Sequence, residues 1–312
     1  MTAFASQLPD FTDLLAAAGS SSNIPAAIVE KDYYLCRALR VVADRHAGQF
    51  ILKGGTSLSK GWNLLERFSE DIDLLMRTEA GGKEISKGAR ERRLKGTRNT
   101  LAQTEGFRLS EGVQPAEKGI HRTAEFNYRS AVESLTGLSN TVKLEMGTRG
   151  GTNPATVRCV TSMVTQFITS QRHTSLADDL ISFDFEMLDI RRTFVEKLFT
   201  VHAAFHEDRA RNRTRHYYDL YRICSLPEVR EFAGTTEYRE MFLSVKQYSL
   251  ECFPKAAVPA GNSLAESPAL SPQGNDLHAL EANYAQEKHL FFTQPPTLTA
   301  ILSAIQQFAP KL

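Results

Sequence analysis

The chain has 312 residues, and at about 150 residues per domain this length predicts about two domains. Hydrophobic residues make up 42% of the chain and charged residues 23%, which supplies a folded core and excludes a disordered or fibrous protein. The formal net charge of +1 gives no overall signal for nucleic-acid binding, so any such signal has to be local.

The cysteines and the N-terminal segment indicate the cellular compartment. Four cysteines lie far apart, at positions 36, 159, 224 and 252. In a chain of this length they indicate free thiols in a reducing compartment rather than a disulfide framework. The segment MTAFASQLPDFTDLL lacks the basic start and long apolar run of a signal peptide. No run approaches the ~18 apolar residues that span a bilayer, so we expect a cytoplasmic protein.

The N-terminal region is predicted to be helical. We expect a short helix near Asp10–Ala17, and a second helix that begins around Pro25 after the SSSN loop. Apolar residues recur through this second segment at helical spacing, at Ile28, Leu35, Leu39 and Val42. Lys31 and Asp32 on the same helix have two interpretations. They line a functional site, or they are solvated charges beside a packed face, which is the commoner situation.

The next segment combines a short strand with a glycine turn. The apolar run Phe50–Leu52 predicts a buried strand. It is followed by Lys53 and by the sequence Gly54-Gly55-Thr56, which opens a helix. Glycines leave backbone N–H groups accessible, and a helix N-terminus favours negative charge. This turn is therefore a candidate phosphate-binding element.

Two carboxylates alternate with aliphatic residues shortly afterwards, in the sequence Asp71-Ile72-Asp73-Leu74. In a strand, side chains two residues apart share a face. Asp71 and Asp73 therefore point one way, while Ile72 and Leu74 point into a core. Like charges this close repel each other unless a cation lies between them. The pair consequently predicts a divalent metal site, and Mg²⁺ favours one or two protein carboxylates together with substrate phosphates.

A strongly basic segment follows the turn at Gly81-Gly82. Between Lys83 and Arg98, seven basic residues stand against two acidic ones, a local charge of +5. The segment is either a solvated helix face or a surface for an RNA backbone. No aromatic residues interleave with the charges, so base stacking is not indicated.

A β-rich region comes next. The segments Arg122–Ser130 and Asn140–Gly147 both alternate between polar and apolar residues. In the second one, Lys143 and Glu145 share a face, and they form either part of a site or a surface Lys/Glu couple. Two further runs, VRCVTSMVTQFI and LISFDFEML, are also predicted to be strands.

From residue 189 the sequence becomes helical. Asp189 is predicted to cap a helix whose apolar stripe consists of Ile190, Phe194, Leu198, Val201 and Phe205. His202 and His206 have a spacing that can bind zinc, but the glutamate of H-E-x-x-H is missing and no third ligand is apparent. We therefore prefer a structural role for them.

An arginine-rich loop and a second helix follow. The loop contains arginines at 209, 211, 213 and 215 and either grips phosphate or is an ordinary basic loop. Arg215 is the strongest candidate because it adjoins the helix HYYDLYRIC, which contains Asp219. A Pro/Gly/Ser-rich loop over Phe253–Asn275 and two short helices complete the chain.

The wording KGGTSL and then RFSEDIDL resembles the AbiEii/AbiGii toxin-like nucleotidyltransferases, a polymerase-β-like branch that includes the MenT toxins. The segment VEKDYYLCRALR resembles the N-terminal helix of that family. The resemblance implies an α+β fold with a nucleotidyltransferase domain and mixed sheet over 1–188. It also implies a mainly helical domain over 189–312 that completes the nucleotide site in a cleft between the two.

The resemblance also implies roles for individual residues. Asp71, Asp73 and a third carboxylate, Glu145, are expected to be catalytic and to hold Mg²⁺, with two ions in the site. Lys197 resembles the triphosphate-binding lysine of the family, and Asp219 resembles its acidic catalytic partner. The remaining nucleotide-binding set is Gly54, Gly55, Thr56, Ser69 and Arg215. Ser69 also matches a serine whose modification would neutralise the enzyme, although it can equally form only a local hydrogen bond.

The function implied is the transfer of a nucleoside monophosphate from an NTP to the 3′ end of RNA. The first expectation is tRNA, with a block of translation as the result. The enzyme would be the toxin of a toxin–antitoxin pair, with a cognate antitoxin encoded nearby and no membrane partner. Two alternatives are transfer to a protein or small-molecule hydroxyl, and a catalytically silent member that binds RNA or protein. Loss of transfer in an Asp71→Ala variant separates an enzyme from a silent binder.

Overall fold

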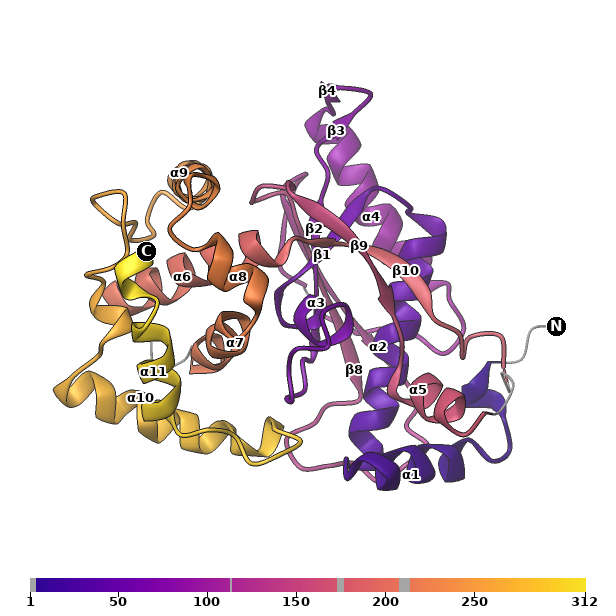
Figure 1. Cartoon of the computed structure of the whole chain (residues 1–312). Helices are drawn as coiled ribbons and strands as arrows, with labels where there is room; N and C mark the ends of the chain where they lie inside the picture. The colour runs from indigo at the N-terminus through magenta and orange to yellow at the C-terminus, as the bar shows by residue number, and fades with distance from the viewer. Residues whose placement is uncertain (1–3, 113, 173–176, 208–213) are drawn as a thin grey trace. The chain divides into compact units, whose positions relative to one another are not determined.

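The computed structural model describes most of the chain, namely residues 4–112, 114–172, 177–207 and 214–312. The chain divides into two compact units (Figure 1). The first unit is built from three stretches, 1–63, 68–148 and 155–187. The second is built from the C-terminal region and two short stretches from earlier in the chain, 188–312, 64–67 and 149–154.

The first unit contains an eight-stranded mixed sheet. Its strands are β1 (Phe50–Lys53), β2 (Asp71–Met76), β5 (Arg108–Leu109), β6 (Ala116–Glu117), β7 (His121–Asn127), β8 (Thr141–Gly147), β9 (Ala155–Val160) and β10 (Phe183–Leu188). The order is β5-β7-β8-β2-β1-β10-β9, with β6 paired to β7. Strand β2 runs parallel to β8 and antiparallel to β1. The predicted α+β fold with a mixed sheet is therefore confirmed.

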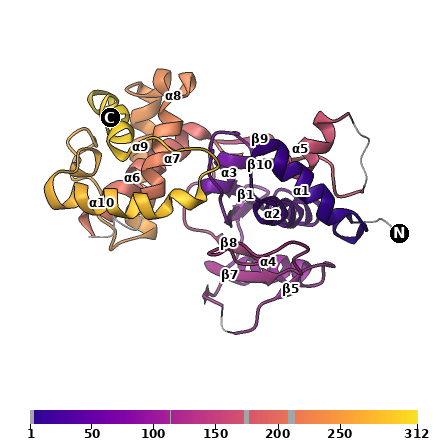
Figure 2. The ribbon, with the colours of Figure 1, turned by 90° about the horizontal axis from the view of Figure 1, so that it is seen from below.

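Two long helices cover one face of this sheet. The helices of the unit are α1 (Phe11–Ser22), α2 (Ala26–Arg45), α3 (Gly54–Lys60), α4 (Lys87–Ala102) and α5 (Met163–Ser170). Helix α2 packs against β8, and α4 packs against β7 (Figure 2). Leu94 of α4 joins the same core as Ile72, Leu74 and Leu144 of the sheet. Because strand side chains alternate, the carboxylates on either side of Ile72 point to the opposite face.

Helix α4 contains most of the basic residues between Lys83 and Arg98, so its position decides between the two interpretations of that segment. Its buried residues face the sheet core, on the side away from the β2 carboxylates. Several of its charges have partners nearby, since Arg90 pairs with Glu84 at 3.1 Å and Lys95 with Glu91 at 3.3 Å. The Gly81-Gly82 turn connects β3 (Glu79–Ala80) to β4 (Lys83–Glu84) in a hairpin, and both glycines have positive φ. The geometry therefore favours a solvated helix face over an RNA surface beside the acids.

One predicted strand is only half correct. The run VRCVTSMVTQFI forms β9 up to Val160, but it continues as helix α5 from Met163. Ser162 caps this helix by accepting a hydrogen bond from the Thr165 N–H. Val164 and Ile168 are buried four residues apart, as a helix requires. The many β-branched residues of the run favour a strand, so the sequence pattern did not reveal the change from strand to helix.

The second unit is helical. Its helices are α6 (Ile190–His206), α7 (Thr214–Cys224), α8 (Pro227–Phe232), α9 (Thr236–Cys252), α10 (Gly274–Gln286) and α11 (Leu298–Gln306). Helix α6 contacts α7, α8 and α9. Asp189 caps α6 by accepting the Arg191 N–H, and Phe194, Leu198 and Val201 are fully buried. The cap and most of the predicted apolar stripe are thus confirmed.

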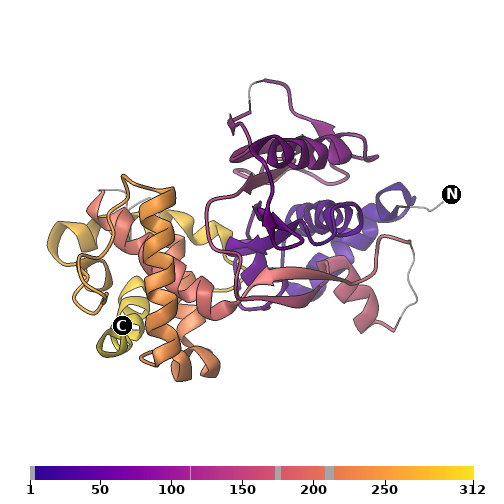
Figure 3. The same ribbon diagram turned by 90° about the horizontal axis from the view of Figure 1, so that it is seen from above.

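Two helices of the second unit were not expected from the sequence. Helix α9, the orange helix upright in Figure 3, and the short α8 lie in a region whose sequence pattern is weak. Exposed apolar residues such as Leu243 and Leu250 blur the helical period of α9. Within the described ranges, no helix is both long and apolar enough to cross a membrane.

A buried ion pair joins α2 to α3. Lys60 pairs with Asp32, and both side chains are almost wholly buried. The second oxygen of Asp32 accepts the N–H of Met163 at 2.7 Å, at the start of α5. Burial would lower the pKa of Lys60, but the charge and the hydrogen bond of Asp32, together with a contribution from Cys36, outweigh it and raise that pKa. The pair therefore fixes three helices of the first unit around one carboxylate.

Removing one member of this pair should strongly destabilise the fold. A Lys60→Met variant leaves the Asp32 charge buried without its cation, and we expect a loss of about 3–5 kcal/mol in the free energy of unfolding. Urea unfolding measures this loss, with Lys83→Met at an exposed lysine of the same unit as the matched control. A Lys60→Met loss no larger than that of the control would contradict the assignment.

Candidate active site

Strand β1, helix α3 and strand β2 position the acid pair. Gly54 has a φ of +70°, and a Cβ at this position would lie 2.1 Å from Oδ2 of Asp73. Both the backbone conformation and the close carboxylate therefore require glycine. In the antiparallel pairing of β1 with β2, Lys53 lies directly opposite Asp73. The glycine turn of the motif thus packs against the carboxylate of the second aspartate.

Thr56 links α3 to the start of β2. Its side chain is fully buried, and its hydroxyl lies 3.2 Å from Oγ of Ser69 and also contacts the backbone carbonyl of Asp71. These contacts position the residues that precede the acid pair. Ser69 is half-buried. Its contact with Thr56 is a local hydrogen bond, which is one of the two roles predicted for it.

The parallel register of β2 and β8 brings the third carboxylate to the pair. Asp71 lies opposite Lys143, and Asp73 lies opposite Glu145. Because directly paired residues share a face, Asp71, Asp73 and Glu145 point to the same side of the sheet. All three are only partly buried. The structure therefore places the three predicted catalytic carboxylates on two neighbouring strands.

Lys143 lies among these carboxylates. Its ammonium contacts the Glu145 carboxylate and lies 3.9 Å from Oδ2 of Asp71. Burial would lower the pKa of Lys143, but the hydrogen bond to Glu145 and the charges of Asp71, Glu145 and Glu125 outweigh it and raise that pKa. The expected Lys/Glu couple is thus present, and it lies on the acidic face itself. We name this set of residues (Asp71, Asp73, Lys143, Glu145 and Glu125) the acidic face.

The oxygen donors of the acidic face fit a divalent ion. In the described part of the chain, no three His, Cys, Asp or Glu side chains converge closely enough to hold a metal by themselves. Mg²⁺ does not need such a group, because it binds one or two carboxylates and completes its shell with phosphates and water. Asp71 and Asp73 would supply these two carboxylates, with Glu145 on the neighbouring strand.

Lys31 and Asp32 lie in the interior of the first unit rather than on its surface. Both are almost completely buried, so the prediction of solvated charges is wrong. Lys31 donates to Oε2 of Glu70 at 2.7 Å and lies 3.3 Å from Oγ of Ser139. Lys31 therefore anchors Glu70, the residue immediately before Asp71. Asp32 instead forms the buried ion pair with Lys60.

In the second unit, a buried charge cluster surrounds Asp219. Arg67 donates to this carboxylate from Nε at 2.9 Å and from Nη2 at 2.8 Å, and Lys197 Nζ donates at 2.7 Å. Lys197 Nζ also lies 3.2 Å from Nδ1 of His216. Burial would raise the pKa of Asp219, but the charges of Arg67 and Lys197 hold that pKa well below its usual range. Two cations thus converge on one carboxylate.

Arg67 is the member of this cluster that the sequence did not single out. It begins the RFSEDIDL motif, two residues before Ser69, and its side chain is buried. The signal that could have found it is its position at the start of this motif, four residues before Asp71. The predicted pairing of Lys197 with Asp219 is present in the structure, while their catalytic roles stay predictions.

The other basic and metal candidates have ordinary contacts. Arg215 is exposed, and its Nε lies 3.4 Å from Oε1 of Glu287. The arginines at 209, 211 and 213 lie outside the described residues. His202 Nδ1 lies 2.8 Å from Oγ of Ser267, and burial together with His206 lowers its pKa to about 4. These contacts support the structural role for the histidine pair.

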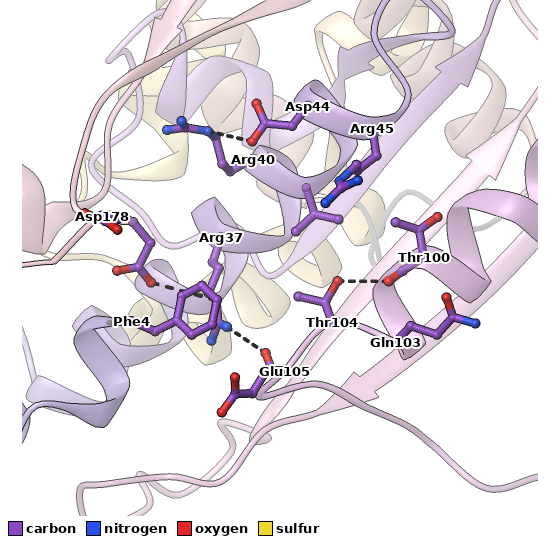
Figure 4. A pocket seen from close by; sticks show the side chains of 12 residues that line it. Phe4, Arg37, Arg40, Asp44, Arg45, Thr100, Gln103, Thr104, Glu105 and Asp178 are labelled. Carbon is purple, nitrogen blue, oxygen red and sulfur yellow. Dashed lines mark hydrogen bonds and ion pairs between the residues drawn. The ribbon is translucent and has the colours of Figure 1, made fainter. Parts of the chain in front are cut away.

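A pocket of about 750 Å³ also lies in the first unit (Figure 4). Arg37 Nη2 donates to the Glu105 carbonyl at 2.7 Å, and Arg40 Nε donates to Asp44 at 3.0 Å. Three of its charged side chains, those of Arg37, Arg40 and Asp44, are therefore engaged with each other or with backbone. None of the predicted site residues is among the described residues that line it, so the predicted chemistry belongs to the acidic face instead.

A glycine turn, an acid pair on a strand and a third acid in register form the arrangement that the sequence predicted for a nucleotidyltransferase. The family model described as "Nucleotidyl transferase AbiEii toxin, Type IV TA system" matches residues 37–307. Since this is most of the chain, the protein belongs to the AbiEii nucleotidyltransferase family. Membership implies an NTP substrate and an antitoxin partner.

A crystal structure described as a "putative nucleotidyltransferase from H. pylori" is 16% identical, with a TM-score of 0.45. That match covers 88% of this chain and 91% of the other chain. No curated protein is similar enough to this chain to count as a match.

The cluster around Asp219 predicts an unequal effect of two arginine substitutions. Arg67→Lys keeps the charge but loses the two-point hydrogen bond in a buried site. We expect it to lower the free energy of unfolding by about 1–3 kcal/mol. Arg222→Lys, in the more exposed pair with Glu66, should change it by no more than about 0.5 kcal/mol. Equal effects in urea unfolding would show that the Arg67 contact is not formed.

Proposed function

We propose that this nucleotidyltransferase transfers a nucleoside monophosphate from an NTP to the 3′ end of RNA, with tRNA as the acceptor, and thereby blocks translation. The observation that carries the chemical part is the shared face of Asp71, Asp73 and Glu145 on paired strands. Membership of a type IV toxin family supports a growth-inhibiting role. The choice of tRNA as the acceptor is supported by the resemblance to the MenT toxins. The cytoplasmic location stays a prediction.

We assign each carboxylate a role on this basis. Nucleotidyl transfer depends on positioning and charge neutralisation rather than on covalent chemistry by the protein. A divalent ion, when bound, neutralises the triphosphate and activates the attacking hydroxyl. Asp71 and Asp73 would hold it, with Glu145 as the third carboxylate. Asp71 and Asp73 are half-exposed, which leaves them accessible to a substrate.

The nucleotide-binding roles rest on charge and contact. Lys197 is a compact cation held by Asp219 in a fixed position, and such an ammonium suits a phosphate. We propose that it binds the triphosphate while Asp219 orients it, and that Arg215 also contacts phosphate. Gly54 and Gly55 would present backbone N–H groups to the nucleotide. Thr56, which is buried, would act by positioning Ser69.

Ser69 is the proposed point of control by the antitoxin. Its hydroxyl is half-buried, two residues from Asp71, and bonded to Thr56. A charged group added there would place negative charge beside the acid pair and repel the triphosphate. We propose that modification of Ser69 silences the enzyme.

Substitution of Asp71 should abolish transfer without unfolding the protein. The purified chain is incubated with Mg²⁺, total RNA and each α-labelled NTP in turn. We expect label on tRNA-sized RNA with the wild type and none with Asp71→Ala, because the first metal ligand is lost. Asp184→Ala, at an exposed carboxylate of β10, is the matched control and should keep activity.

Two results would contradict the proposal. Equal labelling by Asp71→Ala and the wild type would remove the acid pair from the chemistry. Label on protein or small molecules, with none on RNA for any of the four NTPs, would assign a different acceptor to the same site.

Lys197 should affect nucleotide binding more than the chemical step. For Lys197→Met we expect a rise in KM for the NTP on the order of tenfold, with a smaller change in kcat, because a charge-assisted contact to the triphosphate is lost. Steady-state kinetics measures both constants, and circular dichroism verifies the fold. Lys255→Met, at an exposed lysine of the second unit, is the control. A fall in kcat at unchanged KM would contradict this role.

A further inference from the structure

Lys143 occupies the centre of the acidic face. The register places Asp71 beside it on β2 and Glu125 beside it on β7. Glu145 follows two residues later on the same strand and shares its face. The next set of directly paired residues on this face, one on each of the three strands, consists of Asp73, Glu145 and the uncharged Thr123. One lysine is therefore surrounded by carboxylates on three sides.

The contacts of Lys143 involve the same oxygens that a metal would need. Its ammonium contacts Glu145, which is the third proposed ligand, and lies 3.9 Å from Oδ2 of Asp71, which is the first. Its side chain is 33% exposed. A long, partly exposed side chain can leave such a contact at little steric cost, unlike the buried Lys31 and Lys60.

We propose that Lys143 is the resident counter-cation of the acidic face, and that it competes with the divalent ion for Glu145 and Asp71. This inference rests on the proposed function, because it takes these carboxylates as the metal site. In the metal-free enzyme, Lys143 reduces the repulsion among the acids and keeps them in place. For a divalent ion to bind Glu145, the ammonium has to release that carboxylate.

The physical reason is the repulsion between cations. Two positive charges a few ångströms apart repel each other strongly at a partly buried site. A lysine within hydrogen-bond reach of a ligand therefore lowers the affinity of the site for free metal. Lys53, opposite Asp73 on the other side of β2, adds positive charge to the same region but lies on the far side of the pair from Glu145.

The test is metal binding without nucleotide or catalysis. Mn²⁺ is titrated into the full chain, and free Mn²⁺ is measured by electron paramagnetic resonance. We expect Lys143→Met to bind Mn²⁺ about three- to tenfold more tightly than the wild type at low salt, and this gain should shrink at high salt. Lys143→Arg, which keeps the charge, should bind no more tightly than the wild type. Lys83→Met, at a distant exposed lysine, should match the wild type.

The outcomes separate this inference from the proposed function. If Asp71→Ala loses Mn²⁺ binding while Lys143→Met binds no more tightly than the wild type, the competition is refuted and the metal site stands. If Mn²⁺ binding is unchanged in Asp71→Ala, the metal site itself is wrong, and the role of Lys143 falls with it. A thermal melt by circular dichroism verifies that each variant is folded.

Discussion

The parallel pairing of β2 with β8 is the constraint on which the candidate site depends. It aligns Asp71 with Lys143 and Asp73 with Glu145, and a shift by one residue would turn these carboxylates into the core. The apolar residues between them hold that register by packing under α2 and α4. The alternation that builds the core therefore also delivers three acids and one lysine to a single accessible face. Family membership as a nucleotidyltransferase is consistent with that geometry.

The charged cluster around Asp219 and the acidic face differ in burial. Asp219, with Arg67 and Lys197, is buried and fully engaged, because an unpaired charge in the interior is costly. Lys143 and Glu145 are paired as well, but on a half-exposed face where water can replace either partner. The buried cluster therefore holds its members in fixed positions, whereas the pair on the sheet can exchange partners. For this reason we propose that Lys197 binds phosphate from a fixed position, whereas Lys143 exchanges its carboxylate partners.

Local patterns in the sequence predicted the elements that carry the motif, but not the contacts made between distant segments. The strands of Asp71 and Glu145, and the cap of α6 at Asp189, follow from alternation and capping, which act over a few residues. The burial of Lys31, and the partner of Arg67 more than a hundred residues later, depend on tertiary packing that no local pattern encodes. Helix α9 was missed for a related reason, since its exposed apolar side chains obscure the periodicity.

The most direct test of this account is the position of a divalent ion in a crystal of the full chain grown with Mn²⁺ and a non-hydrolysable NTP. Data collected at the manganese edge locate the ion by its anomalous signal, independently of any assay. We predict a peak between the carboxylates of Asp71 and Asp73, in contact with the triphosphate. A nucleotide bound elsewhere, with no manganese at these two residues, would contradict the assignment of the acidic face as the active site.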